Sequence, residues 1–95
     1  MEEKRRLVRK RMVFRGQVQG VGFRWHARFS ASALGLTGWV ENQYDGSVIM
    51  EVQGTDEEIY SMLQELGSGR FIDIQDMEVT TIPLVEDERK FSVRS

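Results

Sequence analysis

Residues 7–35 read LVRKRMVFRGQVQGVGFRWHARFSASALG and contain the start of the fold: a strand, a glycine-rich loop and a helix. Apolar and basic residues roughly alternate from Leu7 to Arg15, as in a strand with one solvent-exposed face, and the strand is expected to end at Gly16. Three glycines within residues 16–22 predict a tight loop with unusual backbone angles rather than continued strand.

A helix is predicted directly after this loop and is expected to stop at Gly35. Its apolar residues follow at spacings of four, four and three, which places them on one helical face. They are Phe23, Ala27, Ala31 and Leu34. Trp25 and Phe29 lie on a different side of the helix. We expect these two side chains to pack locally against another element, the alternative being an exposed self-association surface.

The rest of the chain predicts four further elements. Asp45-Gly46 is a strong hairpin-turn dipeptide and is expected to join two antiparallel strands. Thr55 and Glu58 have the spacing of a capping box that opens an amphipathic helix. The hairpin strands are expected at 37–41 and 47–53, the helix from 55 to 67, and a strand at 72–82. A short last strand is expected at 91–94.

Apart from that last strand, the element order is strand, helix, strand, strand, helix, strand. This order is typical of the α+β ferredoxin-like fold, a split β-α-β sandwich in which an antiparallel sheet carries two helices on one face. A chain of 95 residues suits one domain, which we place at 7–95 after a basic, flexible N-terminal arm at 1–6. Many activities share this architecture, so the function must be inferred from a site.

The composition excludes several classes of function. Without Cys the chain has no disulfide framework, thiolate metal site or cysteine nucleophile, which suits a reducing compartment, and we expect a cytoplasmic location. No stretch approaches the roughly 18 apolar residues of a membrane helix. With a single His and scattered carboxylates, no metal-ligand spacing appears. We expect His26 to have a packing or surface role.

The net charge of −2 hides an uneven distribution of charge. Residues 1–15 hold seven Lys or Arg and two Glu, whereas residues 16–95 hold six basic and thirteen acidic side chains. The acidic body argues against a general nucleic-acid surface. We expect the basic segment to be a solvated tail, the alternative being that it attracts polyanions. Its basic residues are Lys4, Arg5, Arg6, Arg9, Lys10 and Arg11.

The glycine loop, residues 17–22, is the first candidate site because it leads from a strand into the N-terminus of a helix. Free backbone N–H groups and the helix dipole there favour an anion such as phosphate. Glycine spacing alone is equally typical of a ligand-free turn, and the loop is neither a P-loop nor a dinucleotide fingerprint. Arg24 follows in the first helical turn, where either a bound anion or a surface ion pair would balance its charge.

Asn42 is the second candidate, at the end of a strand and three residues before Asp45. An asparagine here is typical of a turn residue that bonds its own backbone. A functional role therefore needs support from elsewhere in the sequence.

Several sequence blocks occur in a fixed order: GQVQGVGFR at 16–24, LGLTGWVEN at 34–42, DGSV at 45–48, QG at 53–54 and FSVR at 91–94. Together they resemble the signature blocks of the acylphosphatase family over residues 7–95, and an ordered set is far more specific than any one block. The chain departs from that family in its basic arm and in residues 68–70, which lack a proline often found there.

The resemblance implies a cofactor-independent hydrolase that splits acyl phosphates into a carboxylate and phosphate. Arg24 matches the family's phosphate-binding arginine and Asn42 its water-orienting asparagine. The matching phosphate-binding loop comprises Gln17, Val18, Gln19, Gly20, Val21 and Gly22. We expect a monomer whose partners are small acyl phosphates, without a membrane or nucleic-acid partner.

The RNA-recognition module uses the same strand order and is the alternative we keep, together with an anion-binding domain without catalysis. Residues 19–24 faintly resemble its glycine-aromatic octet. That octet belongs on the third strand, however, and residues 47–53 contain no aromatic side chain.

Overall fold

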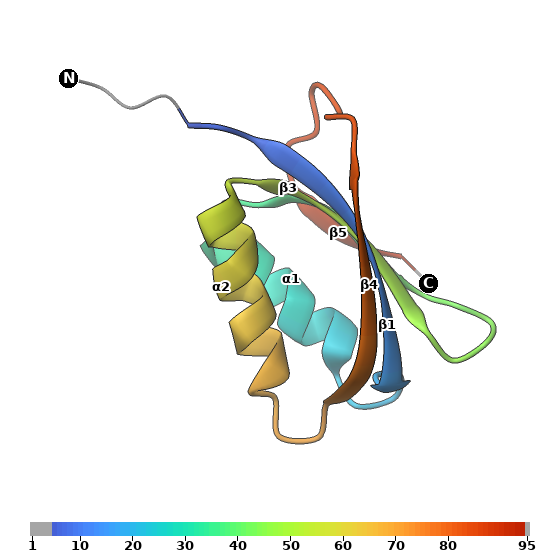
Figure 1. The fold of residues 1–95 in the computed structure, drawn as a ribbon. Helices are drawn as coiled ribbons and strands as arrows, with labels where there is room; N and C mark the ends of the chain where they lie inside the picture. The colour runs from blue at the N-terminus through green and yellow to red at the C-terminus, as the bar shows by residue number, and fades with distance from the viewer. Residues whose placement is uncertain (1–4, 95) are drawn as a thin grey trace.

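The computed structural model describes residues 5–94 and shows a sheet with two helices packed on one face (Figure 1). The elements are β1 (Val8–Gln17), α1 (Phe23–Ala33), β2 (Thr37–Asn42), β3 (Val48–Gly54), α2 (Asp56–Gly67), β4 (Asp73–Ile82) and β5 (Phe91–Arg94). The predicted α+β ferredoxin-like fold is confirmed. Residues 1–4 of the expected N-terminal arm lie outside the described residues.

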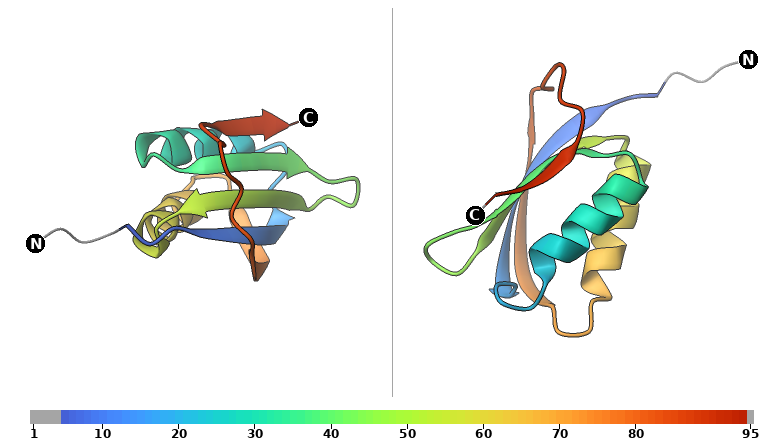
Figure 2. Two further views of the ribbon diagram at one scale, coloured as in Figure 1. Left: turned by 90° about the horizontal axis from the view of Figure 1, so that it is seen from above. Right: turned by 180° about the vertical axis from the view of Figure 1, so that it is seen from behind.

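The five strands lie in the order β4-β1-β3-β2-β5. Four of them pair antiparallel, as expected, but β5 runs parallel to β2 and makes the sheet mixed. Residues 83–90, which we call the crossing segment, pass from β4 at one edge to β5 at the other (Figure 2). A strand that arrives by such a crossover can pair parallel, whereas a tight hairpin cannot produce that direction.

The first strand extends beyond the expected end at Gly16, to Gln17. The pairing of β1 with β4 shifts in register between Arg15 and Gly16, and beyond this shift Gln17 lies opposite Asp73. This irregularity brings the start of the glycine loop beside the start of β4.

The hydrophobic core lies between the sheet and the two helices. Alternate residues of the central strands point inward because side chains along a strand alternate between the two faces. The rings of Phe14 on β1 and Phe23 on α1 lie 4.9 Å apart, between centroids. The other fully buried large side chains on this face are Met12, Val18, Val40, Val48, Met50, Val52, Met62 and Leu66.

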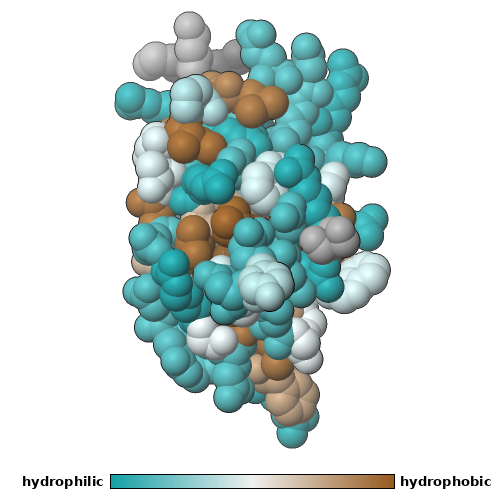
Figure 3. All heavy atoms as spheres, turned by 90° about the vertical axis from the view of Figure 1, so that its right-hand side faces the viewer, coloured by the Kyte–Doolittle hydropathy of each residue, from teal (hydrophilic) through white to brown (hydrophobic). Residues whose placement is uncertain are grey.

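Within residues 5–94 no helix covers the opposite face of the sheet. Hydrophilic side chains cover most of that face, with apolar ones scattered among them (Figure 3). No helix among residues 5–94 is long and apolar enough to cross a membrane.

Trp25 and Phe29 form an exposed patch on α1. They are 61% and 73% exposed, and their ring centroids lie 6.4 Å apart. The guanidinium of Arg28 lies 5.7 Å from the centroid of the Trp25 ring. The two aromatic side chains therefore pack against each other at the surface. The expected packing against another element is wrong, because both rings are exposed.

The two helices begin differently. Thr55 caps α2 as predicted: its hydroxyl oxygen accepts from the Glu58 N–H at 3.2 Å, and the Glu58 carboxylate accepts from the Thr55 N–H at 3.1 Å. In contrast, the N-cap residue of α1 is Gly22, with φ of 82°, and α1 has no side-chain cap and no acidic residue in its first turn. The side-chain cap of α2 satisfies a backbone N–H of its first turn, whereas no side chain caps the N–H groups in the first turn of α1.

The capping box makes a testable contribution to stability in acid. The hydrogen bond from the Thr55 N–H holds the pKa of Glu58 below its ordinary value. A lowered pKa means that the carboxylate stabilises the fold above the pH at which an unfolded Glu titrates, about 4.3, and that this stabilisation is lost as the pH falls through the folded-state pKa. In urea unfolding, Glu58→Gln is expected to be less stable than wild type at pH 7, with a smaller difference at pH 3. A difference that does not change with pH, or that matches the exposed neighbour control Glu57→Gln, would contradict this.

Candidate active site

Three elements meet at one end of the sheet: the glycine loop, the end of β2 with its hairpin, and the end of β5. The side-chain amide of Gln19 donates to the carbonyl oxygens of Gln43 and Ser47, at 2.7 and 2.8 Å. These two residues follow β2 and precede β3. Gln19 therefore fixes the glycine loop against the β2–β3 hairpin, a link that its polarity alone does not reveal in the sequence.

The glycine loop turns through two left-handed residues, Gly20 with φ of 74° and Gly22 with φ of 82°. A side chain at either position would be conformationally strained, although neither Cβ position meets another atom within 4 Å. The other loop residues are placed differently. The Val18 side chain is buried in the core, so only its backbone can face a ligand, and Gln17 is exposed at the end of β1.

The backbone N–H groups of the loop make this end of the sheet electropositive. Within residues 5–94, no protein acceptor bonds the N–H groups from Gln19 to Trp25, whereas the next one, on His26, donates to the Gly22 carbonyl at 3.0 Å. The positive end of the α1 dipole adds to these donors. Such an arrangement binds a tetrahedral oxyanion well. His26 itself is exposed, in keeping with the expected surface role.

Arg24 lies in the first turn of α1 and is half-buried. Its Nη1 donates to the backbone oxygen of Arg94 at 3.0 Å, and among the described residues it forms no ion pair with a carboxylate. Arg94 is paired with Glu41, one residue before Asn42. The C-terminal strand thus holds Arg24 beside the end of β2, where no carboxylate of residues 5–94 balances its charge.

Asn42 is the last residue of β2 and pairs with Val48. Its Oδ1 is buried and has no hydrogen-bond partner among the described residues. A buried polar atom without a partner costs free energy and calls for a functional or structural reason. The expected alternative, a turn residue that bonds its own backbone, does not account for this oxygen.

Asp45 performs the turn role instead. Its carboxylate accepts from the Ser47 hydroxyl at 2.6 Å and from the Ser47 N–H at 2.9 Å. These hydrogen bonds hold the pKa of Asp45 below its ordinary value. The hairpin beside Asn42 is therefore fixed by its own side chains, and no group within residues 5–94 uses the Asn42 Oδ1.

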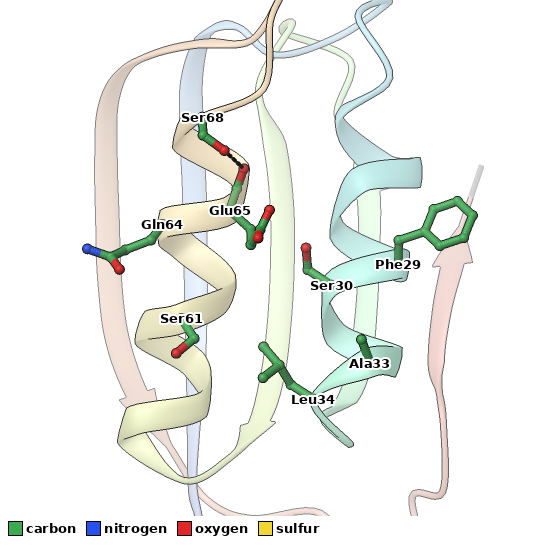
Figure 4. A pocket seen from close by; sticks show the side chains of 8 residues that line it. All are labelled: Phe29, Ser30, Ala33, Leu34, Ser61, Gln64, Glu65 and Ser68. Carbon is green, nitrogen blue, oxygen red and sulfur yellow. Dashed lines mark hydrogen bonds between the residues drawn. The ribbon is translucent and has the colours of Figure 1, made fainter.

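A hollow lies between the two helices, and none of the proposed site residues lines it (Figure 4). Ser30 and Leu34 of α1 point toward α2, and the Ser68 hydroxyl donates to the Glu65 carbonyl at 2.8 Å. Among the described residues that line this hollow, Glu65 is the one charged side chain, and no Lys or Arg lies beside it to offset its repulsion of a phosphate. Within residues 5–94 no three His, Cys, Asp or Glu side chains gather as a metal site would require.

The structure thus places the loop, Arg24 and Asn42 at the same end of the sheet, through hydrogen bonds that the sequence does not show. The sequence does not predict that the Arg94 carbonyl accepts from Arg24. Every residue has a backbone carbonyl, and the side chain of Arg94 does not show that its carbonyl is used. Its closest signal was the resemblance of residues 91–94 to a family's last strand.

Comparisons with known proteins find relatives over nearly the whole chain. A family model described as Acylphosphatase matches residues 10–93. A protein named Acylphosphatase from Clostridium beijerinckii is 36% identical over 93% of this chain and 99% of its own, and one from Bifidobacterium longum is 38% identical over 99% of both. The crystal structure of acylphosphatase from Bacillus subtilis superposes with a TM-score of 0.85 at 31% identity, covering 93% of this chain and 99% of that one.

Proposed function

The chain belongs to the acylphosphatase family and hydrolyses acyl phosphates, and from this premise we propose which of its groups carry the reaction. The backbone N–H groups of the glycine loop and the Arg24 guanidinium bind the phosphoryl group, and Asn42 orients the attacking water. The observation that supports this most is that three groups without a partner among residues 5–94 lie at one end of the sheet: the loop amides, a guanidinium that pairs with no carboxylate, and a buried amide oxygen.

The reaction needs little beyond positioning. The water oxygen forms a bond to phosphorus while the bond between phosphorus and the acyl oxygen breaks, and the electron pair of that bond leaves with the carboxylate. The carboxylic acid has a pKa near 4, so the leaving group needs no general acid. The proton released by the water is carried by the phosphate product or passes to solvent.

The positive groups at the site match the charge that develops in this reaction. Phosphoryl transfer passes through a loose transition state with negative charge on the three equatorial oxygens. Fixed amides and a guanidinium stabilise that charge without reorganising, because the loop is held by Gln19 and the guanidinium by the Arg94 carbonyl. The planar guanidinium of Arg24 offers two parallel donors to phosphate oxygens.

Replacing Asn42 is expected to affect the chemical step more than binding. Without its Oδ1 to accept from the water, the nucleophile is no longer held in line, and kcat for benzoyl phosphate falls roughly 10²-fold. The Ki for inorganic phosphate changes by less than about threefold, because the amides and Arg24 remain. Steady-state kinetics in the presence of a chelator measures both constants.

Gln43→Ala is the matched control, since it removes a neighbouring amide side chain whose Nε2 bonds Glu41 and Asn42, and keeps the carbonyl that Gln19 uses. It is expected to retain kcat within about threefold. Should Asn42→Ala keep near-native kcat, or raise the Ki for phosphate as much as it lowers kcat, the assignment of the water to Asn42 would be wrong.

A further inference from the structure

A second hollow opens on the side of the glycine loop away from the β2–β3 hairpin. It has a volume of about 610 Å³, and Gln17, Gly20 and Val21 of the loop form one wall, with residues 70–73 opposite. We call it the acyl cleft. Its volume falls in the ordinary range for sites that bind small molecules.

The acyl cleft shares Gln17, Gly20 and Val21 with the loop that is proposed to bind phosphate. Gln17 pairs with Asp73, so the connection between α2 and β4 runs directly beside the loop. When the amides of the loop bind the phosphoryl group, the acyl half of the substrate would extend past Gly20 or Val21. On the other flank, Gln19 connects the loop to the hairpin, and the hollow beside the hairpin has a volume of only about 170 Å³. The acyl cleft is therefore the larger space beside the loop.

The walls of the acyl cleft have a distinct chemistry. Phe71 is 67% exposed, and the guanidinium of Arg70 lies 5.6 Å from its ring centroid. Among the described residues Arg70 forms no ion pair. The carboxylate of Asp73 also lines the cleft, but it accepts from the Gln75 amide at 3.1 Å and does not pair with Arg70. A flat aromatic wall with a free guanidinium suits an apolar ligand that ends in an anion.

We propose that the acyl cleft binds the acyl half of the substrate and that Arg70 makes the enzyme selective for acyl phosphates that carry a second anionic group, a carboxylate or a phosphate. This rests on the proposed function, because it requires the phosphoryl group to lie on the glycine loop. Arg70 is a specificity residue, not a catalytic one, since it contacts the part of the substrate that does not react.

Two rigid substrates that differ in one group test the proposal: 4-carboxybenzoyl phosphate, which carries the second anion, and 4-carbamoylbenzoyl phosphate, its neutral isostere. The measured quantity is the ratio of their kcat/KM values, in wild type, Arg70→Gln and Arg89→Gln. Arg89 is exposed on the crossing segment and changes the net charge equally, so it controls for long-range attraction.

Wild type is expected to favour the carboxylate, and Arg70→Gln to lower the ratio about 5- to 10-fold, while Arg89→Gln leaves it unchanged. Phe71→Ala is expected to lower kcat/KM for benzoyl phosphate relative to acetyl phosphate. An equal loss on both benzoyl substrates in Arg70→Gln, or an equal change in Arg89→Gln, would overturn the proposal. Its failure is separable from that of the proposed function, which is measured by the dependence of acetyl phosphate turnover on Arg24.

Discussion

Arg24→Ala is expected to lower kcat/KM for benzoyl phosphate by roughly 10³-fold or more, the largest effect on activity that the site predicts. A guanidinium that neutralises the charge of a transferring phosphoryl group is worth about this much in enzymes of related chemistry. Its geometry here is fixed before substrate arrives, because Nη1 is bonded to the Arg94 carbonyl. Both kcat and the Ki for phosphate are expected to worsen, since the same group contacts ground state and transition state.

Two variants separate this role from a general loss of positive charge. Arg24→Lys keeps the charge but loses the planar pair of donors, so it is expected to recover only part of the activity. Arg28→Ala removes an exposed arginine from the next turn of the same helix and is expected to change kcat/KM by less than about threefold. If Arg24→Ala, folded by urea titration, kept near-native kcat/KM, the phosphate-binding role of Arg24 would be untenable.

The sequence predicts most of the fold because the local signals agree with one another. The glycine at the end of α1, the Asp45-Gly46 turn and the capping box at Thr55 each mark a boundary that the structure confirms. The direction of β5 could not be predicted in the same way. Four residues of strand have no local feature that distinguishes parallel from antiparallel pairing, and the choice depends on where the crossing segment delivers them.

The candidate site could be predicted in its members but not in its connections. Arg24 and Asn42 are found through a resemblance spread over several blocks, since an arginine after a glycine loop and an asparagine before a turn are each common. The bonds that hold them depend on a backbone carbonyl of Arg94 and on an amide of Gln19 reaching across 24 residues. Pairings over such separations follow from the tertiary fold and leave no periodic signal.

Arg9 is a residue for which the prediction from the sequence is wrong. Within a basic segment expected to be a solvated tail, it is only 2% exposed. Its guanidinium donates to Glu51 at 3.0 Å and to Glu88 of the crossing segment at 2.7 Å, with Gln53 at 3.2 Å. Burial by itself would lower the pKa of Arg9, but the hydrogen bonds to Glu88 and Glu51 outweigh it and raise the pKa.

Arg9→Ala is therefore expected to destabilise the fold by about 3–5 kcal/mol, because it removes one partner of a buried network and leaves two carboxylates facing each other. A domain of this size has roughly 5–15 kcal/mol in total, so the loss is a large part of its stability. Arg11→Ala is the matched control. It also pairs with Glu51, at 2.7 Å, but is 44% exposed, and its removal is expected to cost less than about 1 kcal/mol.

The effect of Arg9 should be confined to stability. Arg9 lies eight residues before Gln17 on β1, about 26 Å along a strand from the start of the glycine loop. At a temperature where the Arg9→Ala variant is still folded, kcat/KM per folded molecule is expected to equal that of wild type, whereas urea unfolding shifts to a much lower midpoint. A fall in kcat/KM without a shift in the midpoint would mean that the crossing segment, which Glu88 connects to β1, transmits its position through β5 to Arg24. Equal and small costs for Arg9→Ala and Arg11→Ala would instead mean that burial adds nothing to this ion pair.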